Sequence, residues 1–267
     1  MHTRPVPRLI VASPPPSPMP APMPGPARPL PAHLAFLRDR TRAPAAGVLV
    51  FGDARVDGCF PPQGDQRGLP LGALHEIGAA GRGAETGELP AAFAAALIGR
   101  FPSRAPVLWV ASVADLYPPG LVGLDPARLV LVNPRDDAGV LAAMEIALRE
   151  GGFAAVVGEV GALDRVASRR LAFACQKHNV TAFALRRWPF GNQTQNREVS
   201  AAATRWHLTP APHRRWRVEL AHARGGHPGT WLMEAENGTA HSFRVVTALA
   251  DHPTADTPHP RQAVGDG

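Results

Sequence analysis

Short apolar runs alternate with helix-like patterns along the middle of the chain, from residue 74 to residue 185. The apolar runs contain few polar side chains, as is typical of strands buried on both faces, and they lie at residues 74–77, 106–111, 129–133, 153–157 and 181–185. Hydrophobic positions with helical spacing lie at residues 91–100, 137–150 and 168–178. Strands that alternate with helices predict an α/β fold, with a largely parallel sheet flanked by helices on both faces.

The hydrophobic pattern changes near residue 190, where a polar loop begins. Three strand-like runs follow, at residues 203–208, 216–223 and 230–236. Gly225 and Gly226 lie between the last two runs, as in a β-hairpin connection. The sequence therefore predicts a core at residues 53–190, followed at residues 191–249 by a C-terminal β-rich part that contains a hairpin.

The two ends of the chain have a different composition. Proline dominates residues 1–30, which predicts a disordered tail of polyproline character. Residues 250–267 are predicted to form a second disordered tail. Between the first tail and the core, residues 31–52 are expected to form a helix, at 33–42, and an extended arm.

The chain is basic, and almost all of its positive charge comes from arginine. It has 28 Lys and Arg residues against 22 Asp and Glu residues, a formal net charge of +6. This balance suits contact with nucleic acid or an acidic partner, although high Arg, Ala and Pro usage also fits the codon usage of a GC-rich genome. No apolar run reaches the length of about 20 residues that a membrane span needs. We expect a cytoplasmic protein.

The cysteines and histidines give no pattern of a catalytic or metal site. Cys59 and Cys175 form no disulfide framework, and no His or Cys pair has the spacing of metal ligands. His75 and Glu76 are neighbours on a predicted strand, so their side chains point to opposite faces and cannot act together on one atom. We expect neither a metal site nor catalytic residues.

Residues 68–77 (GLPLGALHEI) lead from a turn into a short strand. Several glycines follow, and then the helical pattern at residues 91–100 begins. A strand, a glycine-rich loop and a helix make up a phosphate-binding loop, because backbone N–H groups and a helix N-terminus converge there on an anion. The segment therefore has the framework of a nucleotide site.

The residues that would bind ATP are missing from this loop. In a working loop, G-x-x-x-x-G-K-[ST], the lysine contacts the phosphates and the hydroxyl contacts Mg²⁺. Gly78 and Gly83 match the two glycines of this motif, but Ala84 and Glu85 stand where the lysine and the hydroxyl residue should follow. If the alignment is shifted by one residue, Thr86 supplies the hydroxyl, but Glu85 then takes the position of the lysine. The only lysine of the chain lies far downstream. We expect a degenerate site without a cofactor, or alternatively an anion site made by backbone alone.

Four segments in the same order resemble the RecA recombinase core. They are residues 68–77, residues 123–134, residues 153–163 and the strand pair at 216–236. The resemblance covers about residues 48–237 and implies a RecA-like fold of the P-loop NTPase type. It also implies that residues 48–51 take the part of the N-terminal arm, which in RecA-like proteins adds to the sheet of a neighbouring subunit.

The departures from the RecA pattern all affect nucleotide chemistry. The Walker B aspartate falls on Gly158, which Glu159 follows, and the catalytic glutamate falls near Ser112. The glutamine that senses the γ-phosphate falls on Arg186. Together with the missing lysine, these changes indicate a RecA-shaped protein without ATPase activity, and hence one that is not an enzyme.

This combination is similar to the ImuA family, the RecA-like accessory proteins of a bacterial mutagenesis cassette. The sequence similarity is highest at residues 68–77, 106–110, 203–206 and 215–226. The resemblance implies an adaptor role in SOS-induced, error-prone translesion DNA synthesis. It implies contact with the polymerase-like protein ImuB and with RecA, and an indirect link to a second DnaE-type polymerase subunit.

Arginines alternate with aromatic residues in the C-terminal half of the chain. The residues concerned are Arg186, Arg187, Trp188, Arg197, Arg214, Arg215, Trp216 and Arg217. Such a pattern suits stacking on single-stranded DNA, and arginine and tryptophan are also common hot spots of protein interfaces. The alternative is a solvated arginine surface with the tryptophans packed at a subunit or domain boundary.

Two other functions are compatible with a RecA-like shape. One is an SOS-induced inhibitor of cell division of the SulA type, which also lacks ATP binding. The other is a DNA-binding RecA-like ATPase with an unconventional site, and the missing lysine argues against it. The first would bind the division protein FtsZ, and the second would hydrolyse nucleotide.

Overall fold

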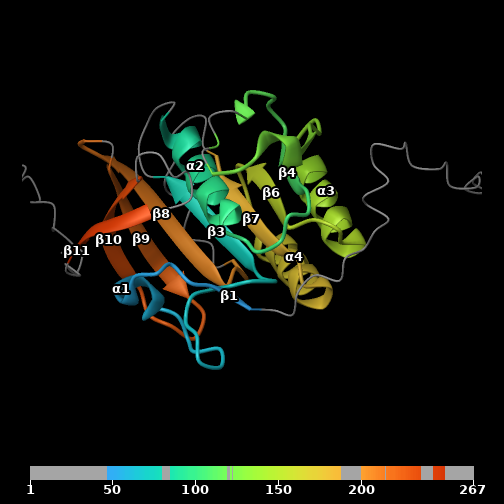
Figure 1. The fold of residues 1–267 in the computed structure, drawn as a ribbon. Coiled ribbons are helices and arrows are strands. Elements are labelled where there is room, and N and C mark those ends of the chain that lie inside the picture. Colours follow the sequence, from blue (N-terminus) through green and yellow to red (C-terminus); the bar gives the residue numbers. More distant parts are fainter. Residues whose placement is uncertain are drawn as a thin grey trace, which may run out of the picture. The chain divides into compact units, whose positions relative to one another are not determined.

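A nine-stranded mixed sheet forms the centre of the molecule (Figure 1). The computed structural model describes residues 47–79, 85–118, 121, 123–187, 200–213, 215–235 and 243–249. The predictions of tails at 1–30 and 250–267, of a helix at 33–42 and of a polar loop at 191–196 lie outside these residues.

Six strands of this sheet are parallel, in the order β8-β3-β7-β6-β4-β5. They are β3 (Leu74–Ala79), β4 (Val107–Ala111), β5 (Leu129–Val132), β6 (Ala155–Val160), β7 (Thr181–Arg186) and β8 (Thr204–Ala211). The apolar runs predicted as buried strands form five of them, and β3, β4, β6 and β7 are almost completely buried. β5 is the edge strand, and its last two residues are exposed.

Helices cover both faces of the parallel strands (Figure 1). α2 (Glu85–Gly99) packs on one face, where Phe93 and Leu97 are fully buried. α3 (Asp137–Glu150) and α4 (Arg165–His178) lie side by side on the other face, over a separate hydrophobic cluster. A short 3-10 helix, Pro126–Arg128, precedes β5. This arrangement confirms the predicted α/β, RecA-like fold.

The helix boundaries follow from capping residues. The Asp136 carboxylate accepts the Gly139 N–H and starts α3, whose predicted bounds are correct. Asp164 caps α4 in the same way, so this helix begins three residues before the predicted start. α4 ends at His178, and the next residue, Asn179, caps it in the left-handed conformation with φ 54°. None of the described helices is long and apolar enough to cross a membrane.

Three antiparallel strands extend the sheet beyond β8. They are β9 (Arg215–Ala223), β10 (Gly229–Ala235) and β11 (Phe243–Leu249). β9 and β10 form the predicted hairpin, and Gly225 in their connection has a φ of +72°. β11 was not predicted as a strand. It completes the C-terminal β-rich part, which forms one sheet with the core.

The segment before β3 packs onto the α2 face of β8 and β9. β1 (Val48–Leu49) pairs with β2 (Leu69–Pro70) of the same chain, and the predicted loop between them contains the one-turn helix α1 (Ala54–Asp57). Phe51 and Phe60 lie against Trp206, with ring centroids 5.8 and 6.1 Å away. The arm at 48–51 thus pairs with β2 within the chain. Addition of this arm to another copy or to a different partner, as the RecA resemblance implies, stays a prediction.

Candidate functional site

The positions of a RecA-type nucleotide site fall at the carboxyl ends of the parallel strands. Gly78 lies in β3, and α2 begins at Glu85, so strand, connection and helix follow in the predicted order. The helix starts six residues before the predicted residue 91 and includes Pro90. Gly83 and Ala84 lie outside the described residues, as do the side chains of Glu85 and Thr86.

Gly158, at the Walker B position, is packed closely by a side chain of α3. A Cβ atom at this residue would lie 2.1 Å from the sulfur of Met144 and 2.9 Å from its Cγ, so Met144 would have to shift. Met144 belongs to α3 and is fully buried. Side chains alternate between the faces of a strand, and position 158 faces the α3 helix. The Walker B position is thus used for packing the sheet against α3.

The next residue, Glu159, belongs to an internal network on the opposite face. It accepts hydrogen bonds from Trp109 Nε1, at 2.8 Å, and from the Arg187 guanidinium, also at 2.8 Å. Arg187 also forms a two-bond ion pair with Asp115. Arg187 holds the pKa of Asp115 below its usual value, and Asp115 raises the pKa of Arg187. The network ties the ends of β4, β6 and β7 together without a ligand.

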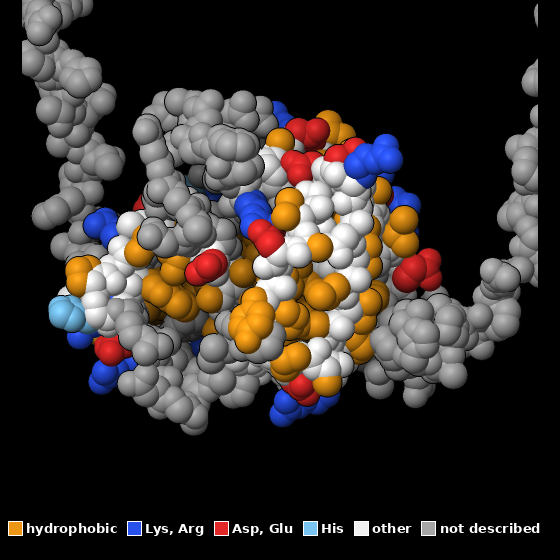
Figure 2. Space-filling model, turned by 90° about the horizontal axis from the view of Figure 1, so that it is seen from above, with side chains coloured by type: hydrophobic (Ala, Val, Ile, Leu, Met, Phe, Trp, Pro, Cys, Tyr) orange, Lys and Arg blue, Asp and Glu red, His pale blue; other side chains and the backbone are white. Residues whose placement is uncertain are grey.

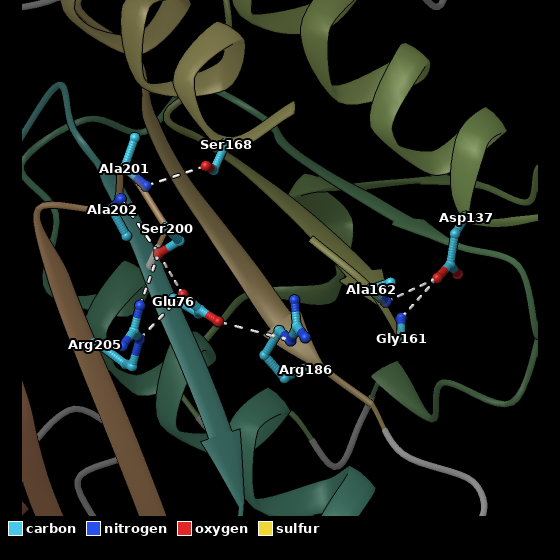
Figure 3. Close-up of polar contacts among 10 residues, drawn as sticks. All are labelled: Glu76, Asp137, Gly161, Ala162, Ser168, Arg186, Ser200, Ala201, Ala202 and Arg205. Atoms are coloured by element: carbon cyan, nitrogen blue, oxygen red, sulfur yellow. Dashed lines mark hydrogen bonds and ion pairs between the residues drawn. The ribbon is translucent and has the colours of Figure 1, made fainter. Parts of the chain in front are cut away.

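A carboxylate of the chain itself fills the turn after β6 (Figure 3). Asp137 Oδ2 accepts the backbone N–H groups of Gly161, at 2.9 Å, and of Ala162, at 3.1 Å. Consecutive N–H groups of this kind often bind a phosphate or another anion. Here they are satisfied by the first residue of α3, and the turn is fixed against that helix.

A second charged cluster lies at Glu76 of β3 (Figure 3). Its buried carboxylate accepts the Ser200 hydroxyl at 2.6 Å and lies 3.3 Å from Arg205 Nε and 3.6 Å from Arg186 Nε. Arg186 is only 5% exposed. The position of the γ-phosphate-sensing glutamine is therefore occupied by an arginine that is paired with the central strand.

His75 lies on the other face of β3, as the strand alternation predicts. Its Nε2 lies 2.9 Å from the Pro70 carbonyl and must donate to it. Its Nδ1 therefore accepts from the Thr204 hydroxyl, 2.8 Å away, and this hydroxyl accepts from Trp206 Nε1. Burial lowers the pKa of His75 to about 4, so the ring is neutral. This is a structural hydrogen-bond chain that joins β2, β3 and β8.

Five of the predicted Arg/Trp contact residues lie in the described part of the chain, and these five do not share one surface. Trp188, Arg197 and Arg214 lie outside the described residues. Arg186 and Arg187 belong to the two internal networks. On β9, Trp216 packs against the core, whereas Arg215 and Arg217 point to the opposite face. Arg215 lies 3.5 Å from Glu234, and Arg217 is exposed. Within β9, the arginine side chains and the tryptophan ring therefore lie on opposite faces of the sheet. They cannot contact the same nucleic-acid base together.

Several residues of these networks were not predicted from the sequence. They are Trp109, Asp115, Ser200 and Arg205. Arg187 is 28 residues from Glu159 and 72 from Asp115 along the chain, so no local motif connects them. Among the described residues, no group of three His, Cys, Asp or Glu side chains could hold a metal ion. The site therefore consists of charge pairs that hold the sheet together.

Comparison with known proteins gives one family. No family model matches the chain. The protein named Protein ImuA from Caulobacter vibrioides strain NA1000 / CB15N is 43% identical over 236 residues, which cover 80% of this chain and 95% of that protein. Protein ImuA from strain ATCC 19089 of the same species matches with the same identity and coverage. At this identity and coverage, the chain belongs to the ImuA family.

Proposed function

We propose that this protein is a non-catalytic adaptor in damage-induced mutagenesis. In this role it acts in the cytoplasm during the SOS response and supports error-prone translesion synthesis. It docks onto an ImuB-type polymerase-like protein, onto RecA, or onto both, and so links indirectly to a second DnaE-type polymerase subunit. Membership of the ImuA family supports the pathway.

The packing of Gly158 is the main observation that supports a protein without ATPase activity. A RecA-like sheet is present, but its Walker B position is a glycine without a side chain, and the buried Met144 packs closely against it. A P-loop enzyme needs a carboxylate at this position to hold the Mg²⁺ ion. The Glu159–Arg187–Asp115 network supports the same view, since it joins the strand ends by the chain's own charges.

The surface is compatible with docking to other proteins. On the face shown in Figure 2, hydrophobic side chains gather near the centre, and Lys and Arg side chains lie in small separate groups beside Asp and Glu. An apolar centre with charged residues around it is common in protein interfaces. On the described part of this face, such an apolar centre supports an adaptor that binds other proteins.

The test is affinity capture of a tagged full-length copy from its own cells after DNA damage, with mass spectrometry of the bound proteins. We expect the ImuB-type protein or RecA to be recovered. A variant with Arg217→Glu and Arg244→Glu tests the outer face of the C-terminal strands, because both side chains are exposed there. Arg104→Glu with Arg135→Glu, also exposed, is the control with the same charge change.

Loss of the partner with the first variant and not with the control would place docking on β9 and β11. Equal recovery with both variants would place docking elsewhere. Recovery of FtsZ without any polymerase component or RecA would contradict the proposal and favour an inhibitor of cell division.

A further inference from the structure

α3 and α4 form a groove on their outer side, away from the sheet. It has a volume of about 340 Å³ and is lined by Glu145, Arg149, Arg170, Phe173, Ala174, Lys177 and His178. Its floor is apolar, because Ala174 is buried between the helices. The groove lies on the face of the sheet opposite α2. None of its residues takes part in the networks at the strand ends.

The charges of the groove leave it basic. The Glu145 carboxylate forms ion pairs with both Arg149 and Arg170, and it is only 12% exposed. Both arginines remain more than 60% exposed and can still donate to another acceptor. With Lys177, three cations face one carboxylate, which gives a net charge of +2. A partner that covers the groove needs negative charge.

One large apolar side chain, Phe173, stands between two of these cations on α4. Phe173 is 65% exposed and lies under the Lys177 ammonium, 6.0 Å from ring centroid to nitrogen. On α4, Val166, Arg170, Phe173 and Lys177 follow one another at intervals of four, three and four residues, which places them in one stripe. Val166 is 67% exposed. Exposed apolar and charged side chains therefore share one face of α4.

From these observations we infer that the groove between α3 and α4 binds an acidic peptide segment of a partner protein, and that this segment carries at least one large apolar side chain. The stripe spans twelve residues of α4, or eleven steps of 1.5 Å and roughly 16 Å, which a helical segment of about three turns would match. Nucleic acid fits less well, because the groove contains Glu145 and Phe173 separates two of its cations. This inference goes beyond the proposed function and does not depend on it.

The experiment is a selection of random twelve-residue peptides, displayed on phage, against the immobilised full-length chain. We expect enrichment of peptides rich in Asp and Glu that carry a Phe, Leu or Trp. The enriched peptides are then synthesised with a fluorophore, and their affinity is measured by fluorescence anisotropy. We expect Lys177→Glu and Phe173→Ala each to weaken binding about tenfold or more.

Matched control variants are available on the same chain. Arg135→Glu makes the same charge change at another exposed site, and Tyr117→Ala removes an aromatic ring that is 72% exposed. Both should bind the peptides like the wild type. Thermal unfolding of all four variants should match the wild type, since each altered side chain is exposed and outside the two hydrophobic clusters.

Three results would overturn the inference. The first is that selection enriches no peptide, or peptides without an acidic bias. The second is that the groove variants bind the peptides as tightly as the controls do. The third is that single-stranded DNA binds the wild type and Lys177→Glu weakens this binding, while no peptide is displaced. That outcome would assign the groove to nucleic acid. Failure in any of these ways would leave the adaptor proposal untouched.

Discussion

At the residue scale, His75 shows how a central strand is fixed by the hydrogen bonds of a neutral ring. Its Nε2 donates to the Pro70 carbonyl, so Nδ1 of the neutral ring accepts from the Thr204 hydroxyl, which in turn accepts from Trp206 Nε1. A second proton would reverse the hydrogen bond to Thr204, whose own proton would lose its acceptor, and would place a charge in the core. His75 is therefore neutral in the folded protein.

The pH dependence of stability follows from this state. The pKa of His75 is lowered from 6.5 to about 4 on folding, so the unfolded chain binds a proton first as the pH falls. The contribution to stability is complete above pH 6.5 and is lost as the pH falls toward 4, a loss of about 3 kcal/mol. Urea unfolding at several pH values should show that His75→Gln removes much of this slope. Parallel curves for wild type and variant would contradict it.

The packing of Gly158 can be tested by a double-mutant cycle. Gly158→Ala should destabilise the fold by about 1–3 kcal/mol, because its methyl group would overlap the buried Met144 side chain. Met144→Ala alone should cost about 2–5 kcal/mol through the cavity that it leaves. The double variant should cost less than the sum, since the new methyl group enters that cavity. Additive free energies of unfolding would show that the two side chains do not compete for space.

The Glu159–Arg187–Asp115 network predicts unequal effects of its members. Arg187→Met should destabilise by about 2 kcal/mol, because it leaves the buried Glu159 without its cation. Asp115→Asn should cost less than about 1 kcal/mol, since Asp115 is at the surface and water replaces its partner. Chemical unfolding measures both values. A larger loss for Asp115→Asn than for Arg187→Met would contradict the assigned roles.

At the element scale, β8 belongs to the core although it lies in the predicted C-terminal part. It pairs with β3 in parallel, and its Trp206 is fully buried against Phe51, Phe60 and Phe93. Truncation before Ala203 would expose the edge of β3 and remove this packing. We expect the truncated chain to show no cooperative thermal transition by circular dichroism. A chain that ends at residue 249 is the control and should unfold cooperatively. A cooperative transition of the shorter chain would show that the C-terminal strands form a separate unit.

Most elements of the parallel sheet could be predicted, because a strand buried on both faces is a continuous apolar run. The bounds of α2 were harder, since its first turn precedes Pro90, a residue that normally marks a helix start. α1 is too short to give a periodic pattern. β11 lacks the clean alternation that predicts a half-buried strand, and its pairing with β10 contains a bulge.

The candidate site was predictable only in part. Local spacing predicted that Ala84 and Glu85 replace the residues of a phosphate-binding loop, and the resemblance to RecA placed Gly158 at the Walker B position. Neither could show that Met144 packs on Gly158 or that Arg187 joins Glu159, because these contacts connect distant parts of the chain. The Arg/Trp pattern suggested one binding surface, whereas the alternation along β9 divides it between two faces.

At the scale of the whole molecule, the chain has a RecA-like sheet whose central strands are joined by its own charged side chains. Ion pairs join the ends of these strands, and Asp137 occupies the turn after β6. These contacts suit the proposed adaptor, which would present a fixed surface without a nucleotide. The account therefore predicts that ATP changes neither the stability nor the activity of the protein.

Two measurements on the purified full-length chain test this claim most directly. The first is isothermal titration with Mg·ATP, and the second is an assay of released phosphate with and without single-stranded DNA. RecA, measured in parallel, is the positive control. The account predicts no saturable heat of binding and no phosphate release above the blank. Saturable binding of one nucleotide per chain, with hydrolysis that DNA stimulates, would contradict it and would establish an ATPase with an unconventional site.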